Sequence, residues 1–243
     1  MDIRTLELLT GLAHELRTPL GAIAGYAELL RLGAHGPMPA TQLEMLARIV
    51  RNQQAAVEIL DAVVAYGTAS SGALPLHPTP TQVATLVQDA VDACALSAAQ
   101  RGVKLHLAGS SDDVGVVDVM VVVDAAAAHV VITAMLRDAI RSASAGDAIE
   151  VSLSSGADVA QVDVAHPVLA TALVAYDGES LFTPYARGAA QRHVSGDVEA
   201  LALPQARALA RRSGGDVVAV LESSRHTLRL TFPRVVGTIA TAG

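Results

Sequence analysis

The chain has 243 residues, of which 51% are hydrophobic and 17% are charged, so it has enough apolar side chains for one large core or two small ones. The formal net charge of −7 argues against a nucleic-acid-binding face, and a single cysteine, Cys94, excludes a disulfide framework. The sequence contains neither a membrane-length apolar run nor a signal peptide, so we expect a cytoplasmic protein without a membrane anchor.

The first helical pattern, within residues 12–30, separates an apolar face from a polar one. His14 lies on the polar side, with Glu15 beside it and Thr18 one turn later. A neutral imidazole nitrogen can attack phosphorus, an acid can act as a base, and a hydroxyl can hold a water. Pro19 predicts a bend just after the histidine. The apolar residues recur at helical spacing and predict one stripe, made of Leu9, Leu16, Leu20, Ile23, Ala27 and Leu30.

Glycines and prolines within residues 33–39 end this pattern, and a second helix is predicted from Thr41, which predicts a helical hairpin. Helices of this length span roughly 40 Å, and two alone cannot bury apolar stripes that long. We therefore expect a homodimer that forms a four-helix bundle; the alternative is a hairpin packed on its own C-terminal domain. The second stripe comprises Leu43, Leu46, Ile49, Val50, Gln53, Val57, Leu60 and Val64.

A stretch of small, polar and proline residues at 68–80 predicts a linker. From residue 81 onward, helical and alternating patterns predict an α/β sandwich with one antiparallel sheet covered on one face by helices. The expected helices are 81–100, 125–143 and 199–212, and the expected strands are 103–107, 117–123, 149–153, 159–164, 216–221 and 227–232.

The segment His14-Glu15-Leu16-Arg17-Thr18-Pro19-Leu20 resembles the phosphoacceptor box of two-component sensor histidine kinases. The resemblance implies that His14 is phosphorylated, that Glu15 assists as a base, and that Thr18 orients water in a phosphatase reaction. The order of elements after residue 81 is similar to the ATP-binding domain of the same family. The expected fold is α+β: a helical hairpin at 1–67 in a dimeric four-helix bundle, a linker at 68–80, and a kinase ATPase-type α/β sandwich at 81–243.

The second domain departs from the family where nucleotide should bind. Two asparagines that serve magnesium and the phosphates align with Ala134 and Asp138, of which only the carboxylate could bind a metal. The aspartate that accepts from adenine and the glycine motif after it align with the segment that contains His166 and Pro167, which has no glycine.

The glycine-rich turn that cradles phosphates aligns with Val198, Glu199 and Ala200, where the acid would repel a triphosphate. Residues that serve packing are retained, in the segment 181–188 and in the glycine cap at 213–215. We therefore expect the shape of the ATPase domain without ATP binding.

These features predict a histidine phosphotransferase that carries phosphate between receiver-domain aspartates through His14. The chain itself would need no cofactor, because the receiver supplies magnesium. The expected partners are response-regulator receivers, a hybrid histidine kinase and a second copy of the chain, with neither nucleic acid nor membrane. Helix geometry suggests a receiver-docking surface below His14 that includes Arg17, Gly21, Ala24, Gly25 and Arg51.

Three alternatives remain open: a response-regulator phosphatase that uses Glu15 and Thr18, a non-catalytic scaffold that binds a receiver or kinase, and an active kinase with a divergent pocket. A zinc site is not expected, because the histidines lack paired ligand spacing.

Overall fold

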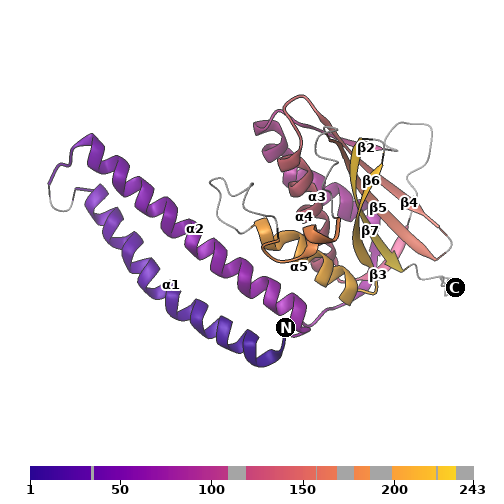
Figure 1. Ribbon diagram of the computed structural model, residues 1–243, viewed down its shortest axis with the longest axis horizontal. Coiled ribbons are helices and arrows are strands. Elements are labelled where there is room, and N and C mark those ends of the chain that lie inside the picture. The colour runs from indigo at the N-terminus through magenta and orange to yellow at the C-terminus, as the bar shows by residue number, and fades with distance from the viewer. Residues whose placement is uncertain are drawn as a thin grey trace, which may run out of the picture. The chain divides into compact units, whose positions relative to one another are not determined.

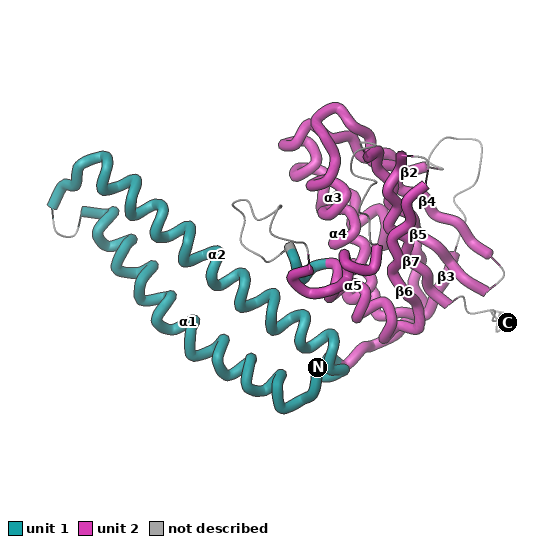
Figure 2. The backbone as a smooth tube through the Cα atoms, in the orientation of Figure 1, with its two compact units in different colours: residues 1–74, 188–202 teal, residues 75–187, 203–243 magenta. Residues whose placement is uncertain are grey.

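The computed structural model describes residues 1–33, 36–108, 119–156, 158–168, 178–186, 199–222 and 224–233. The chain divides into two compact units, which Figure 2 colours separately. The first consists of residues 1–74 with 188–202, and the second of residues 75–187 with 203–243.

Two long helices, α1 (Ile3–Arg31) and α2 (Ala40–Ser71), form the hairpin of the first unit (Figure 1). Asp2 caps α1, because its carboxylate accepts a 2.8 Å hydrogen bond from the Thr5 backbone N–H. The helix continues through Pro19, although a proline cannot donate a hydrogen bond to the carbonyl one turn before it. Gly72 follows α2 with φ of 81°, the left-handed conformation in which glycine commonly ends a helix.

The predicted apolar stripe of α1 is only partly covered within one chain. Leu9, Leu20 and Leu30 are half-buried and Ala27 is buried, whereas Leu16 and Ile23 are 38% and 46% exposed. The same holds for α2, where Leu46 is buried but Leu43 and Ile49 are 36% and 44% exposed. One neighbouring helix therefore covers only part of so wide an apolar surface.

The second unit is built on a five-stranded sheet in the order β2-β4-β5-β7-β6. The prediction of an entirely antiparallel sheet was wrong, since β2 and β4 pair in parallel and only the remaining neighbours are antiparallel. The strands are β2 (Lys104–Ala108), β4 (Ala148–Ser155), β5 (Val159–Pro167), β6 (Asp216–Glu222) and β7 (Arg225–Pro233).

A short strand at the start of this unit was missed from the sequence. Strand β1 (Thr79–Gln82) pairs antiparallel with β3 (Met120–Val123) in a separate two-stranded sheet. The stretch predicted as a linker, 68–80, therefore contains the end of α2 and the start of β1. Proline and threonine in this stretch suggested a loop, but pairing with β3 extends the backbone into a strand. Residues 117 and 118 of the predicted strand 117–123 lie outside the described part.

Three helices lie on one side of the five-stranded sheet, as Figure 1 shows: α3 (Val83–Gln100), α4 (Ala125–Ser142) and α5 (Glu199–Arg212). Alternate residues of the central strands face these helices and form the core, because successive side chains of a strand point to opposite faces. The inward residues of β5 and β7 are Ala160, Val162, Val164 and His166, which pair with Phe232, Leu230, Leu228 and His226.

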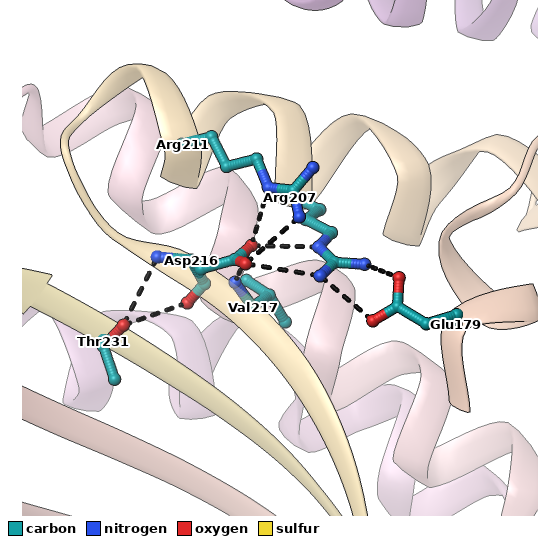
Figure 3. Close-up of polar contacts among 6 residues, drawn as sticks. All are labelled: Glu179, Arg207, Arg211, Asp216, Val217 and Thr231. Carbon is teal, nitrogen blue, oxygen red and sulfur yellow. Dashed lines mark hydrogen bonds and ion pairs between the residues drawn. The ribbon is translucent and has the colours of Figure 1, made fainter. Parts of the chain in front are cut away.

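A cluster of charged side chains joins α5 to β6 and to the 3₁₀ helix η2 (Gly178–Phe182), as Figure 3 shows. The buried Arg207 donates to Asp216 at 2.9 Å and to Glu179 at 2.5 Å, and its guanidinium lies 4.6 Å from the centre of the Phe182 ring. Burial opposes the charge on Arg207, but its two acidic partners outweigh this effect and raise its pKa. Arg211 donates to the same Asp216 at 3.1 Å from an exposed position.

The end of α5 retains the predicted glycine cap. Gly214 has φ of 79°, and the Gly215 N–H donates to the Ala210 carbonyl at 3.0 Å. A Cβ on Gly215 would lie 1.9 Å from the Thr231 carbonyl oxygen, so only glycine fits beside β7. Among the described residues, no helix has the length and apolar character needed to cross a bilayer.

Candidate functional site

The structure places the predicted phosphoacceptor residues on an open face of α1. His14, Glu15 and Thr18 are all exposed. His14, Thr18, Gly21 and Gly25 recur at steps of four, three and four, so they share one face of the helix. A Cβ built on Gly21 or on Gly25 meets no atom within 4 Å. The histidine therefore lies at one end of a polar face that leaves room for another backbone.

A second face of α1 carries apolar side chains that the hairpin does not cover. They recur at steps of four, four and seven and are Leu8, Leu12, Leu16 and Ile23, with exposed fractions of 75%, 52%, 38% and 46%. On α2, Met45 and Ile49 are 64% and 44% exposed. Soluble proteins seldom leave such a row of large apolar side chains open, so this face has the character of an interface.

The predicted docking residues Arg17 and Arg51 lie on the polar side of the hairpin. Arg17 forms an ion pair across the hairpin with Asp61 of α2. Arg51, Gln54, Glu58 and Asp61 recur at steps of three, four and three, so they share a face of α2. The ion pair thus joins the helices on the side that carries the exposed Arg51. Ala24, by contrast, is half-buried, whereas the two glycines are exposed.

In the second unit, the side chains at the expected nucleotide positions are buried. Ala134 and Asp138 lie in the interior face of α4, 8% and 6% exposed. The Asp138 carboxylate forms an ion pair with Arg141, one turn later on the same helix. Burial raises the pKa of Asp138, while the charge of Arg141 lowers it to a lesser extent. The carboxylate at the expected magnesium position is therefore bound by a cation of its own helix.

His166, at the position expected for the adenine-binding acid, faces His226 on the adjacent strand. The His166 Nε2 and the His226 Nδ1 lie 3.1 Å apart, and the ring centres are 5.1 Å apart in an edge-on arrangement. Burial, followed by the charge of His166, lowers the pKa of His226 to about 4, against a small opposing effect of Asp138. His226 is therefore neutral near neutral pH and lies within hydrogen-bond distance of His166 in the interior.

No role was predicted from the sequence for Arg141, His226 or Asp61. For His226 a signal was available, because it alternates with Leu228, Leu230 and Phe232 and so shares their inward face. No local signal could pair Arg17 with Asp61, since the contact depends on the register of two helices. Val198 and the side chain of Glu199 lie outside the described residues, and Ala200 is half-buried in the first turn of α5.

Comparison with known proteins identifies the hairpin. Residues 4–72 match the His Kinase A (phospho-acceptor) domain family. This segment is a His Kinase A domain. A region of 97 residues is 35% identical to the sensor histidine kinase TrcS of Mycobacterium tuberculosis, and 99 residues are 28% identical to the sensor histidine kinase GacS of Pseudomonas protegens. These regions cover 40% and 41% of this chain, but only 19% and 10% of the two relatives.

Solved structures extend the likeness to the fold of the whole chain. Full-length ShkA, in complex with AMPPNP, matches 96% of this chain with a TM-score of 0.72 at 17% identity, over 47% of its own length. ThkA, in complex with the response regulator TrrA, matches 94% with a TM-score of 0.58 at 16% identity, over 61% of its own length. The chain therefore combines a His Kinase A domain with the ATPase-like fold of a two-component histidine kinase core.

Proposed function

We propose that the chain is a histidine phosphotransferase of a two-component phosphorelay, in which His14 takes phosphate from one receiver aspartate and delivers it to another without ATP. One contrast carries the proposal. His14 is exposed on a helix face with room for a partner, whereas the polar side chains at the expected nucleotide positions are held by neighbours within the unit: Asp138 by Arg141, and His166 by His226. Nucleotide would have to break both contacts and would gain neither an adenine acceptor nor a glycine cradle.

The transfer step needs only groups that a receiver and His14 supply. A neutral imidazole nitrogen of His14 donates its lone pair to phosphorus while the phosphorus–oxygen bond to the receiver aspartate breaks. The aspartate leaves as a carboxylate, and the other ring nitrogen of the phosphorylated imidazole releases its proton. Glu15 is the neighbouring base that can accept this proton. Delivery to the next receiver reverses the step, with magnesium held by that receiver.

The polar side of the hairpin is the receiver-docking surface in this proposal. Gly21 and Gly25 continue the His14 face without side chains, so a receiver helix can lie close to α1 there. Arg17 and Arg51 line the adjoining side. The neighbour ThkA in complex with TrrA supports a response-regulator partner for a chain of this fold. A hybrid kinase is the proposed phosphate donor.

The apolar face of α1 supports the proposed homodimer. Leu8, Leu12, Leu16 and Ile23 form a row along the helix, on a different face from His14. Pairing with the same face of a second chain would bury these residues in a four-helix bundle and leave both histidines open.

A second candidate, a response-regulator phosphatase, is favoured by one observation. Glu15 and Thr18 are both exposed beside His14, where they could hold a water against a docked phosphoaspartate. This reaction would consume no phosphohistidine and would therefore not need His14 as a nucleophile.

The deciding experiment follows ³²P on the wild type and on His14→Ala. Each is mixed with labelled Mg-ATP alone, and separately with a panel of receiver domains labelled by acetyl phosphate. We expect label on the wild type from a receiver only, and none on His14→Ala. Label from ATP would establish a kinase, and loss of receiver label as free phosphate would establish the phosphatase. Receiver binding without phosphate transfer or phosphate release would establish a non-catalytic scaffold.

A further inference from the structure

An ion pair across the hairpin lies one turn from the predicted phosphoacceptor His14. The guanidinium of Arg17 binds the carboxylate of Asp61 across the hairpin, and the two side chains remain 44% and 54% exposed. Arg17 follows His14 by three residues, so their Cβ atoms are neighbours on the helix surface, about 5–6 Å apart. An arginine at this spacing is long enough to reach either Asp61 or a group attached to the imidazole.

Phosphorylation would place a second and stronger anion within reach of that guanidinium. A phosphoryl group carries roughly −1.5 to −2 charge near neutral pH and three acceptor oxygens, whereas a carboxylate carries a single charge. The planar fork of arginine binds either anion through two parallel hydrogen bonds. Because the ion pair is exposed on both sides, exchange of partners would involve little desolvation.

We propose that Arg17 exchanges Asp61 for the phosphoryl group when His14 is phosphorylated, and that Asp61 limits the strength of the new contact by competing for the guanidinium. This inference rests on the proposed phosphorylation of His14. Asp61 is a positioning residue here, because it acts on the phosphoryl group through Arg17. The competition keeps phosphohistidine from becoming too stable to pass its phosphate onward.

Two other acidic residues lie near the ion pair in the hairpin. Glu15 adjoins His14 but would repel a phosphoryl group, and Glu58 lies one turn before Asp61 on the same face of α2. Glu58 is exposed and has the same charge as Asp61, so it provides a matched control for the general electrostatic effect of removing an acid.

The test uses phosphoramidate as a small phosphate donor, which reaches exposed histidines without a receiver. Its phosphorus–nitrogen bond breaks as the bond to the His14 nitrogen forms, and ammonia leaves with the proton. At a fixed ratio of phosphoramidate to ammonium, ³¹P NMR gives the phosphorylated fraction of His14, identified by the signal that His14→Ala lacks.

We expect Asp61→Asn to raise the ratio of phosphorylated to free His14 about two- to fivefold, the range of an exposed ion pair. Arg17→Gln should lower this ratio, and Asp61→Asn should have no effect in the Arg17→Gln background. Glu58→Gln should change the ratio less than Asp61→Asn.

An equal effect of Asp61→Asn in both backgrounds, or no effect in the wild type, would overturn the proposal. Failure of every receiver to phosphorylate His14 would count against the proposed function alone, because phosphoramidate still loads the histidine.

Discussion

His166 and His226 lie opposite each other on β5 and β7 and share a hydrogen bond of 3.1 Å in the core of the second unit. They are the last inward-facing pair of this ladder, and its other inward-facing pairs are apolar. A hydrogen-bonded imidazole pair can replace an apolar pair here, because one ring donates to the other.

This pair predicts loss of stability in mild acid. The pKa of His226 is lowered to about 4 in the folded protein, against about 6.5 when unfolded, so the unfolded chain binds more protons between these values. The contribution of His226 to the free energy of unfolding is therefore complete above pH 6.5. It is lost as pH falls toward 4, by about 3 kcal/mol in total. Urea unfolding of the wild type and of His226→Gln at pH 7, 6, 5 and 4 measures it.

The comparison with His226→Gln isolates this effect from that of Asp138. The pKa of Asp138 is raised by burial, so its protonation in acid acts in the opposite direction. We expect the difference in free energy of unfolding between the wild type and His226→Gln to become smaller as pH falls. This difference changes sign in acid if glutamine packs well in place of the imidazole. Parallel stability curves would show that His226 is not buried in neutral form.

The ion-pair cluster of α5 predicts unequal effects of its two arginines. Arg207→Gln leaves Asp216 and Glu179 without their shared buried cation and should lower the free energy of unfolding by about 2 kcal/mol. Arg211→Gln removes an exposed partner of the same Asp216 and should cost less than about 1 kcal/mol. Chemical denaturation of both variants tests the difference, and equal losses would contradict it.

The uncovered apolar face of α1 predicts that a single charge disrupts the dimer. We expect the wild type to sediment as a dimer and Leu12→Asp as a monomer, because a carboxylate in the interface would lose water without a partner. Leu96 of α3 is 71% exposed and serves as the control. A dimeric Leu12→Asp protein, or a monomeric wild type, would place the dimer interface elsewhere or exclude one.

The glycines of the His14 face predict a size limit for receiver docking. Gly25→Leu should weaken binding of a receiver at least tenfold, because it fills the space in which a partner helix would lie. Gly25→Ala should bind nearly normally and raise stability by about 0.5–1 kcal/mol, since alanine favours the helix and meets no atom within 4 Å. Calorimetric titration with a receiver and thermal melts measure the two effects. Equal binding by both variants would argue against docking at Gly25.

The roles of Glu15 and Thr18 separate relay from dephosphorylation. In a relay, Thr18→Ala should transfer phosphate within about twofold of the wild type, whereas Glu15→Gln should slow transfer at least tenfold through loss of the base. In a phosphatase, Thr18→Ala should abolish release of phosphate and His14→Ala should retain it. Rates of label transfer and of phosphate release from one phosphorylated receiver distinguish the two patterns.

The hairpin and most of the second unit could be predicted from the sequence alone. The hairpin, the phosphoacceptor motif at His14 and most elements of the sheet follow from local spacing, because helix and strand periods are written in consecutive residues. The likeness to solved histidine kinases bears out that α+β fold. Strand β1 was missed because its pairing with β3 comes from a segment about 40 residues later.

Only the tertiary structure determines the contacts between residues that are distant in sequence. The sequence placed His14 on a helix and noted that Asp138 and His166 depart from a nucleotide site, since residue identity and helix period suffice for that. Only folding brings Asp61 to Arg17 and His226 to His166, because these contacts depend on helix and strand register and are set by packing over the whole unit. The part of the α1 apolar stripe that is covered is decided in the same way, since the position of α2 determines which side chains it covers.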